Sequence, residues 1–174
     1  VSDPITPTLA FANDAGVPAS SYLVLDNNYV KVLDKYNDRY IWIPAASSTA
    51  GIMAATDLAE GPWFSPAGQK RGQYFGIVDI AYNPTKAQRD QLYAVGINPI
   101  VNLPGRGTTL YGDKTRENRP SAFNRSNVRR LFLNIERAIS IAARGVMFEF
   151  NDEFTRAEFV NIVEPYLREI QGRR

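Results

Sequence analysis

Three carboxylates gather near the C-terminal end of the chain, at Glu149, Asp152 and Glu153. Paired carboxylates can perform general acid–base catalysis, and clustered carboxylates can hold a divalent cation. The spacing of a calcium-binding loop, with its central glycine, is missing here. Acidic residues are also favoured in the first turn of a helix, where they meet the positive end of its dipole. We therefore interpret the cluster as a helix start, and a hydrolase that uses Glu149 and Asp152 is the enzymatic alternative.

Catalysis by an activated nucleophile and metal binding usually need histidine or cysteine, and the sequence contains neither. This composition excludes Ser-His-Asp and Cys-His arrangements, thiolate ligands and most zinc sites. Ser47, Ser48 and Ser65 have no histidine to activate them, and a helix cap explains the first two. We predict a protein that is not an enzyme and that has no metal site and no cofactor.

The segment 107–115 (Gly-Thr-Thr-Leu-Tyr-Gly-Asp-Lys-Thr) superficially resembles a phosphate-binding loop. That motif needs a lysine directly after its second glycine, so that the ammonium and the backbone amides meet one phosphate. Here Asp113 stands between Gly112 and Lys114 and adds a negative charge. The segment therefore predicts no nucleotide site.

Charge is unevenly distributed along a chain whose net charge is only +2. Residues 114–130 hold six basic side chains and one acidic one, a local charge of +5. Residues 149–164 hold five acidic side chains and one basic one, a local charge of −4. A basic and an acidic surface on one chain favour head-to-tail contacts between copies. Two alternatives remain for the arginines: a basic module that binds nucleic acid, or a face that is only solvated. The candidate interface residues are Arg125, Arg129, Arg130, Arg137, Glu149, Asp152 and Glu153.

Helices and strands that would position these residues follow from turn residues and hydrophobic periodicity. Residues 1–20 are rich in proline and glycine and predict an extended connector. The predicted strands are 22–25, 29–33, 39–44, 74–82, 98–103, 108–111 and 146–150, of which the first two form a hairpin over 26–28. The predicted helices are 49–58, capped by Ser47 or Ser48, then 86–94, a helix from Ser126 to Gly145, and a last helix capped by Asp152 or Thr155.

This alternation indicates an α/β class, with α+β as the alternative, in which helices flank a mixed sheet. The 174 residues, 44% of them hydrophobic, suffice for one domain or one and a half. No apolar run reaches the roughly 18 residues of a membrane span, so no membrane insertion is expected.

Six short segments, in order, carry a resemblance to a known family from about Trp42 to the end of the chain. Each is weak alone, but their order over most of the chain is specific. They are Trp42–Gly51, Thr56–Asp57 with Gly61–Gly68 (Gly-Pro-Trp-Phe-Ser-Pro-Ala-Gly) and Arg71–Gly72, Gly96–Asn98, Tyr111–Thr115, Asn127–Leu131 (Asn-Val-Arg-Arg-Leu) and Phe148–Asp152 (Phe-Glu-Phe-Asn-Asp). On these segments the chain resembles the contractile tail sheath family of myoviruses, in the style of T-even-type bacteriophages.

The resemblance implies a structural protein of the virion, made in the cytoplasm of the host bacterium. Sheath subunits polymerise around an inner tube and contract to drive it through the host envelope. The partners it implies are other copies of the subunit, the inner tail tube protein, and baseplate and tail terminator proteins, with no nucleic acid. We expect the region around Arg129 and Arg130 to contact the tube or an acidic neighbouring subunit.

The resemblance also implies a fragment with three parts. Residues 1–20 would be the connector, 21–97 the end of a subtilisin-like α/β domain, and 98–174 the sheath C-terminal domain without its last strands. Family members continue beyond the last helix into strands that add to sheets of neighbouring subunits. The fragment is therefore expected to lack what polymerisation needs.

Overall fold

The computed structural model describes residues 3–173, which divide into two compact units. Unit 1 runs to Arg130, and unit 2 begins at Leu131. The elements of unit 1 are α1 (Ile5–Ala12), β1 (Leu25–Asp26), β2 (Tyr29–Asp34), β3 (Arg39–Pro44), α2 (Ala46–Ala59), β4 (Ile77–Ile80), α3 (Lys86–Ala94), β5 (Ile97–Asn98), β6 (Ile100–Leu103), β7 (Gly107–Leu110) and the 3-10 helix η1 (Ala122–Asn124). Helix α4 (Ser126–Ala143) begins in unit 1 and continues into unit 2, which also holds the 3-10 helix η2 (Arg144–Val146) and α5 (Glu153–Gly172).

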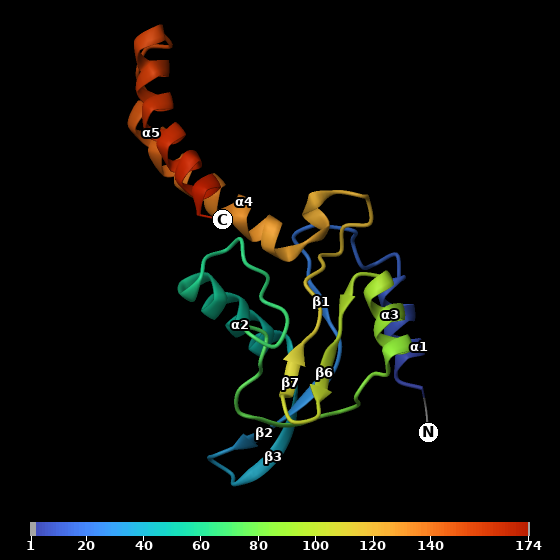
Figure 1. Ribbon diagram of the computed structural model, residues 1–174. Coiled ribbons are helices and arrows are strands. Elements are labelled where there is room, and N and C mark those ends of the chain that lie inside the picture. Colours follow the sequence, from blue (N-terminus) through green and yellow to red (C-terminus); the bar gives the residue numbers. More distant parts are fainter. Residues whose placement is uncertain (1–2, 174) are drawn as a thin grey trace. The chain divides into compact units, whose positions relative to one another are not determined.

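The strands of unit 1 form three small sheets (Figure 1). β2 is the centre of an antiparallel sheet with the order β3-β2-β4, β6 and β7 form a hairpin, and β1 pairs in parallel with β5. Pro99 separates β5 from β6, and it has no N–H to donate to a ladder. Because helices alternate with strands, the predicted α/β class is confirmed, with the strands distributed over three sheets.

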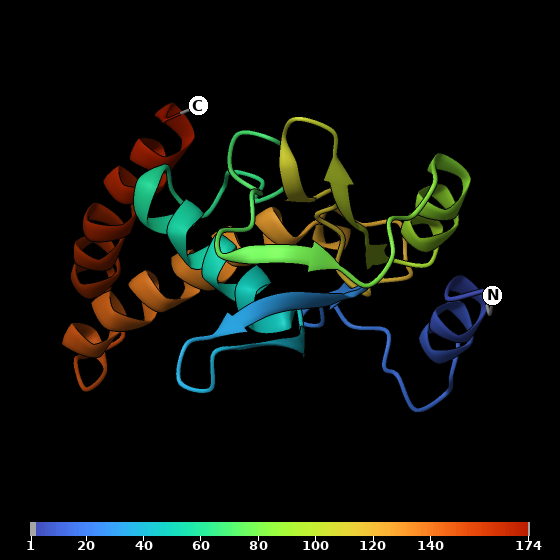
Figure 2. The same cartoon turned by 90° about the horizontal axis from the view of Figure 1, so that it is seen from below.

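The larger apolar core lies between the β3-β2-β4 sheet, α2 and the β6–β7 hairpin. Val30 and Ile80 of the sheet belong to one buried cluster with Ile52 of α2 and with Ile100 and Leu110 of the hairpin. Figure 2 shows α2 crossing one face of this sheet. Side chains of β3 alternate between half-buried and exposed from Tyr40 onward, so the opposite face of the sheet lies outside this core.

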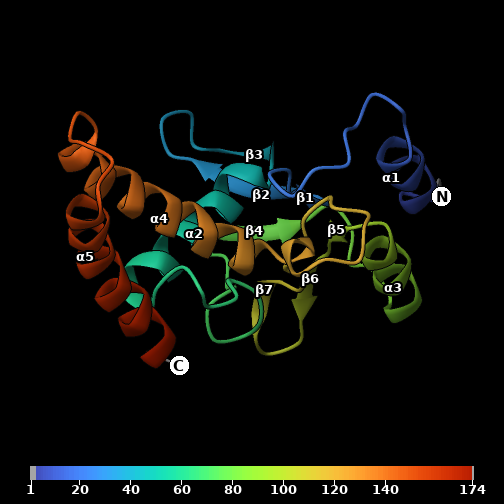
Figure 3. The same cartoon turned by 90° about the horizontal axis from the view of Figure 1, so that it is seen from above.

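A second buried cluster holds α1 against α3. Ile5 and Ala12 of α1 pack with Leu92 of α3 and Ile97 of β5, and all four are at most 2% exposed. The two helices lie side by side in Figures 1 and 3. Helix α1 therefore belongs to the folded body of unit 1.

The prediction of an extended connector over residues 1–20 is therefore wrong for residues 5–12, which form α1. The carboxylate of Asp3 accepts hydrogen bonds from the N–H of Ile5 at 3.0 Å and from the hydroxyl of Thr6 at 2.7 Å. Pro4 and Pro7 lie at the start of the helix, where a backbone N–H has no acceptor within the helix anyway. Prolines that usually interrupt a helix are here compatible with its first turn.

The predicted hairpin between residues 22–25 and 29–33 is also wrong. β1 pairs with β5, and the antiparallel partner of β2 is β3. The buried side chain of Asn27 accepts from the N–H of Ile100 at 2.7 Å and donates to the hydroxyl of Tyr82 at 2.7 Å. Asn28 takes a φ of +89°. The polar turn residues thus carry the chain from one sheet to another instead of closing a hairpin.

The starts of α3 and α5 agree with the sequence prediction, and the start of α2 does not. The predicted helix 86–94 is confirmed as α3, with Thr85 and Gln88 forming a reciprocal capping box. The helix predicted for 49–58 begins earlier, at Ala46, so Ser47 and Ser48 lie inside its first turn and do not cap it. The cap by Asp152 on α5 is confirmed, since its carboxylate accepts from the N–H of Thr155 at 2.8 Å.

The strand predicted for residues 146–150 is absent. η2 follows α4 directly, and the chain then passes through a turn to α5. The described part of unit 2 contains no strand, so no backbone partner exists there for the alternating Val146, Phe148 and Phe150. The division between the units also falls after Arg130 and not after Ile97. The assignment of 21–97 and 98–174 to two sheath domains stays a prediction.

Candidate functional site

The seven candidate interface residues fall into two groups. Arg125, Arg129 and Arg130 lie in unit 1 around the start of α4, and the other four lie in unit 2. The first three are neighbours along the chain, and their side chains contact different partners. The contacts of the basic segment determine which of its charges are free to bind a partner.

Arg125 forms an ion pair within unit 1. Its Nη1 lies 2.6 Å from Oδ1 of Asp113, and it also contacts the hydroxyl of Tyr93. The hydrogen bond that Arg125 donates to the Asp113 carboxylate raises the pKa of Arg125. Lys114 donates from Nζ to the backbone oxygen of Tyr93 at 2.8 Å and lies 4.2 Å from the centre of that ring. Burial and the neighbouring charge of Arg125 lower the pKa of Lys114.

The guanidinium of Arg129 lies between two aromatic rings. Its central carbon is 4.4 Å from the ring centre of Tyr22 and 4.0 Å from that of Phe123. Nη2 donates to the hydroxyl of Ser21 at 2.7 Å. A planar guanidinium favours such stacking. The first turn of α4 is thereby fixed to the segment that precedes β1.

Arg130 fixes the same turn to α2. Its Nη2 forms an ion pair with the carboxylate of Asp57 and donates to the backbone oxygen of Met53 at 3.0 Å. The side chain of Arg130 is only 14% exposed, and burial lowers its pKa. One turn earlier, Asn127 donates from Nδ2 to the backbone oxygen of Trp63 at 3.0 Å. We call the contacts of Asn127, Arg129 and Arg130 the α4 anchor.

The remaining arginines of the basic segment are also engaged. Arg116 is 7% exposed and donates to the backbone oxygen of Ala12 and to Oδ1 of Asn118. Arg119 lies 3.4 Å from a carboxylate oxygen of Glu117. The +5 segment is therefore largely used for contacts inside unit 1, which sequence reasoning missed. Asp57 and Tyr22 lie far from the arginines in the sequence, Asp113 lies 12 residues before Arg125, and no local pattern marks these residues as partners.

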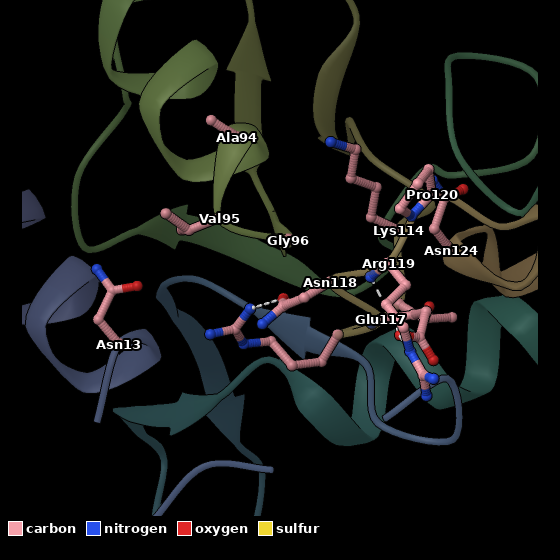
Figure 4. A pocket seen from close by; sticks show the side chains of 12 residues that line it. Asn13, Ala94, Val95, Gly96, Lys114, Glu117, Asn118, Arg119, Pro120 and Asn124 are labelled. Carbon is pink, nitrogen blue, oxygen red and sulfur yellow. Dashed lines mark hydrogen bonds and ion pairs between the residues drawn. The ribbon is translucent and has the colours of Figure 1, made fainter. Parts of the chain in front are cut away.

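A polar cavity of about 480 Å³ lies beside Arg116 (Figure 4). Asn13 and Gly96 line one part of it, and Glu117 and Asn118 line another. Figure 4 shows Asn118 between Asn13 and the Glu117–Arg119 pair. The polar groups here contact one another, as the hydrogen bonds of Asn118 and Glu117 show. The cavity therefore lies between the C-terminal end of α1 and the loop after β7.

The unit 2 candidates all lie on the surface. Arg137, Glu149, Asp152 and Glu153 are exposed. The carboxylate of Asp152 caps α5, and the hydrogen bond from Thr155 lowers its pKa. A dyad sharing a proton with Glu149 would raise one carboxyl pKa instead. The arrangement is that of a helix start.

The part of the chain that the structure describes contains no cluster of three or more acidic residues close enough to hold a metal ion. Among the same residues, no helix is both long and apolar enough to cross a bilayer.

Comparison with known proteins is consistent with this picture. Residues 13–116 match the phage tail sheath protein central domain. The chain is 50% identical over 153 residues to the tail sheath protein of Vibrio phage KVP40, and 42% identical over 150 residues to that of Enterobacteria phage T4. These alignments cover 88% and 86% of this chain.

A solved structure shares the fold. The helical sheath of the anti-feeding prophage in its contracted state superimposes with a TM-score of 0.80 and 26% identity, covering 91% of this chain and 43% of that chain. The chain spans 23% of the length of each of the two phage relatives. On the match of residues 13–116 to its central domain, the chain belongs to the phage tail sheath protein family.

Proposed function

We propose that this chain is part of a subunit of a contractile phage tail sheath, which polymerises around an inner tube and contracts to drive that tube through a host envelope. The observation that carries the proposal is the 50% identity to a tail sheath protein over most of the chain. The similar anti-feeding prophage sheath is described as helical and contracted. The whole protein would reside in the tail of the virion after synthesis in the host cytoplasm.

Contraction requires two packings of the same subunits, of which the contracted one has the lower free energy. A subunit serves this purpose when its body keeps its shape while contacts between bodies rearrange. The α4 anchor supports such a role, because ion pairing, ring stacking and hydrogen bonding hold one helix turn to three other segments of unit 1. The function we propose is mechanical, and we expect no catalytic turnover.

The partners we propose are other copies of the subunit, the inner tube protein, and baseplate and terminator proteins. Arg137, Glu149, Asp152 and Glu153 remain the candidates for direct contact, since all four are exposed. Arg125 is half-exposed but paired with Asp113. Arg129 and Arg130 would act by keeping the start of α4 in place.

Binding to nucleic acid is not part of the proposal. That activity needs several cations that are free to neutralise phosphates. Arg129 stacks on aromatic rings of its own unit, and Arg130 and Arg125 are paired with Asp57 and Asp113. These three cations are therefore already engaged within the unit.

Electron microscopy of the complete protein tests the proposal. We expect tubular helical polymers to form when the complete protein is expressed with its inner tube protein. Reversal of charge at both Arg129 and Arg130 should reduce the number and length of these polymers, whereas Lys86→Glu on the exposed start of α3 should not. A complete protein that stays monomeric in the presence of its tube would contradict the proposal.

A further inference from the structure

The outer face of the β2–β3 hairpin is an exposed aromatic surface. Tyr29, Leu33, Tyr40 and Trp42 are 55%, 42%, 55% and 47% exposed. The pairing Tyr29↔Pro44, Lys31↔Trp42 and Leu33↔Tyr40 places them on one face. Val30, on the other face, is fully buried. Contiguous apolar surface of this kind on a protein usually marks an interaction site. We call this set, with Lys31, the aromatic hairpin face; the hairpin projects from the body of unit 1 in Figure 1.

A cation lies at the centre of this face. The ammonium of Lys31 is 5.3 Å from the ring centre of Tyr40 and 5.8 Å from that of Trp42. No carboxylate among the described residues forms an ion pair with it; Asp79, its register partner on β4, instead accepts from the N–H of Ile80 at 2.8 Å. An ammonium has three donors and gains from a carboxylate, more so where rings exclude water. The face is thus built for a partner that supplies apolar rings and a negative charge.

Residues 147–154 (Met-Phe-Glu-Phe-Asn-Asp-Glu-Phe) have that composition. Phe148, Phe150 and Phe154 are 95%, 86% and 77% exposed, and Met147 is 62% exposed. Glu149 stands between two of these rings and is exposed as well. We call these residues the acidic aromatic segment. Three phenyl rings that are open to solvent indicate a surface that a partner covers, because burial of each ring is favourable.

We propose that the acidic aromatic segment of one copy binds the aromatic hairpin face of a second copy, with Glu149 paired to Lys31. The inference rests on the proposed function, which requires contacts between copies. Each chain carries one of each surface, so the contact is heterologous and every copy can bind a neighbour on two sides. Heterologous contacts that do not close into a ring produce open helical arrays. The phenyl rings supply area, and the charge pair sets the register.

Charge exchange in the complete protein tests this pairing. Lys31→Glu and Glu149→Lys, each alone, should weaken self-association by about tenfold or more, because a like-charge pair then lies between desolvated rings. The double variant restores opposite charges and should recover most of the association. Lys86→Glu is the matched control, since it makes the same change of charge on exposed α3. Thermal unfolding of each variant keeps loss of folding separate from loss of association.

A photo-crosslinking residue in place of Tyr40 gives an independent measurement. In a mixture of isotopically light and heavy copies, we expect cross-linked peptides that join the substituted hairpin of one label to residues 147–154 of the other. The inference is overturned if the wild-type protein polymerises while Lys31→Glu polymerises equally well, or if the cross-links join only residues of the same chain or an unrelated segment. A wild-type protein that forms no polymers at all would instead overturn the proposed function.

Discussion

Arg130 of α4 and Asp57 of α2 form an ion pair in which the cation is the more deeply buried partner, with side chains 14% and 38% exposed. Nε and Nη1 of Arg130 are buried and have no hydrogen-bond partner among the described residues. Burial accordingly lowers the pKa of this arginine. The pair therefore holds α4 against α2, but the guanidinium of Arg130 is left incompletely hydrogen-bonded. Arg130 and Asp57 consequently differ in how much free energy their burial costs.

Removing the anion should cost more than removing the cation. Asp57→Ala leaves a buried guanidinium unpaired, which we expect to lower the free energy of unfolding by roughly 2 kcal/mol, less than for a fully buried pair because solvent reaches Asp57. Arg130→Met keeps the volume and removes the desolvated charge, so its cost should be at most about 1 kcal/mol. Urea unfolding of the three proteins measures the difference. Equal costs for both variants would show that the charge of Arg130 is solvated.

Arg129→Lys should behave as a disruptive substitution. An ammonium cannot stack flat between Tyr22 and Phe123, and it lacks the fork that reaches Ser21. We expect a loss of about 1 kcal/mol of stability, measured by urea unfolding. Lysine at the exposed Arg137 is the matched control and should change stability little, because that position lies on the surface of α4. If Arg129→Lys leaves the free energy of unfolding unchanged, the positive charge alone is sufficient to hold the first turn of α4.

Two glycines should respond to alanine in opposite directions. A Cβ on Gly112 would lie 2.7 Å from Oδ1 of Asn98, a fully buried side chain that also accepts from the N–H of Lys114 at 2.7 Å. Asn98 cannot move without losing that bond, so Gly112→Ala should destabilise by about 1–3 kcal/mol. Gly51 lies inside α2 with open space around it, and Gly51→Ala should stabilise by about 0.5–1 kcal/mol. Thermal unfolding should show the two shifts with opposite signs.

Asp26 should make stability depend on pH. Burial raises the pKa of this carboxyl above its ordinary value of 3.8, while the side chains of Thr49 and Asn98 partly oppose the shift, and Oδ1 has no hydrogen-bond partner among the described residues. Below pH 3.8 both states hold the proton and the carboxyl costs the folded state nothing. As the pH rises from there through the raised folded-state pKa, the unfolded state ionises first and stability is lost.

Asp26→Asn stays neutral and should remove this loss. The variant should gain stability over the wild type as the pH rises above 3.8, and the gain should level off once the folded-state carboxyl has ionised. Urea unfolding at a series of pH values provides the measurement. A difference between the two proteins that stays constant with pH would show that the Asp26 carboxyl is solvated.

Local patterns were sufficient for the elements whose causes are local. The period of α4, the bounds of α3 and the cap of α5 follow from side chains within four residues of each other. The same patterns failed where the partner was distant. Residues 146–150 alternate like a strand, but a strand exists only when a second one offers its backbone groups. α1 depends on Leu92 and Ile97 for its burial, and a proline-rich sequence does not reveal them.

The candidate site divides in the same way. The sequence by itself determined the family, through short segments in a fixed order, and it determined which residues carry charge. Only the tertiary structure decided what those charges do, because the partners Asp57, Asp113 and Tyr22 become neighbours of the arginines when the chain folds. A charge run looks the same in a sequence whether it faces water or its own core. Its use depends on distances across the fold, since stacking requires direct contact and salt screens exposed charges over about 10 Å in water.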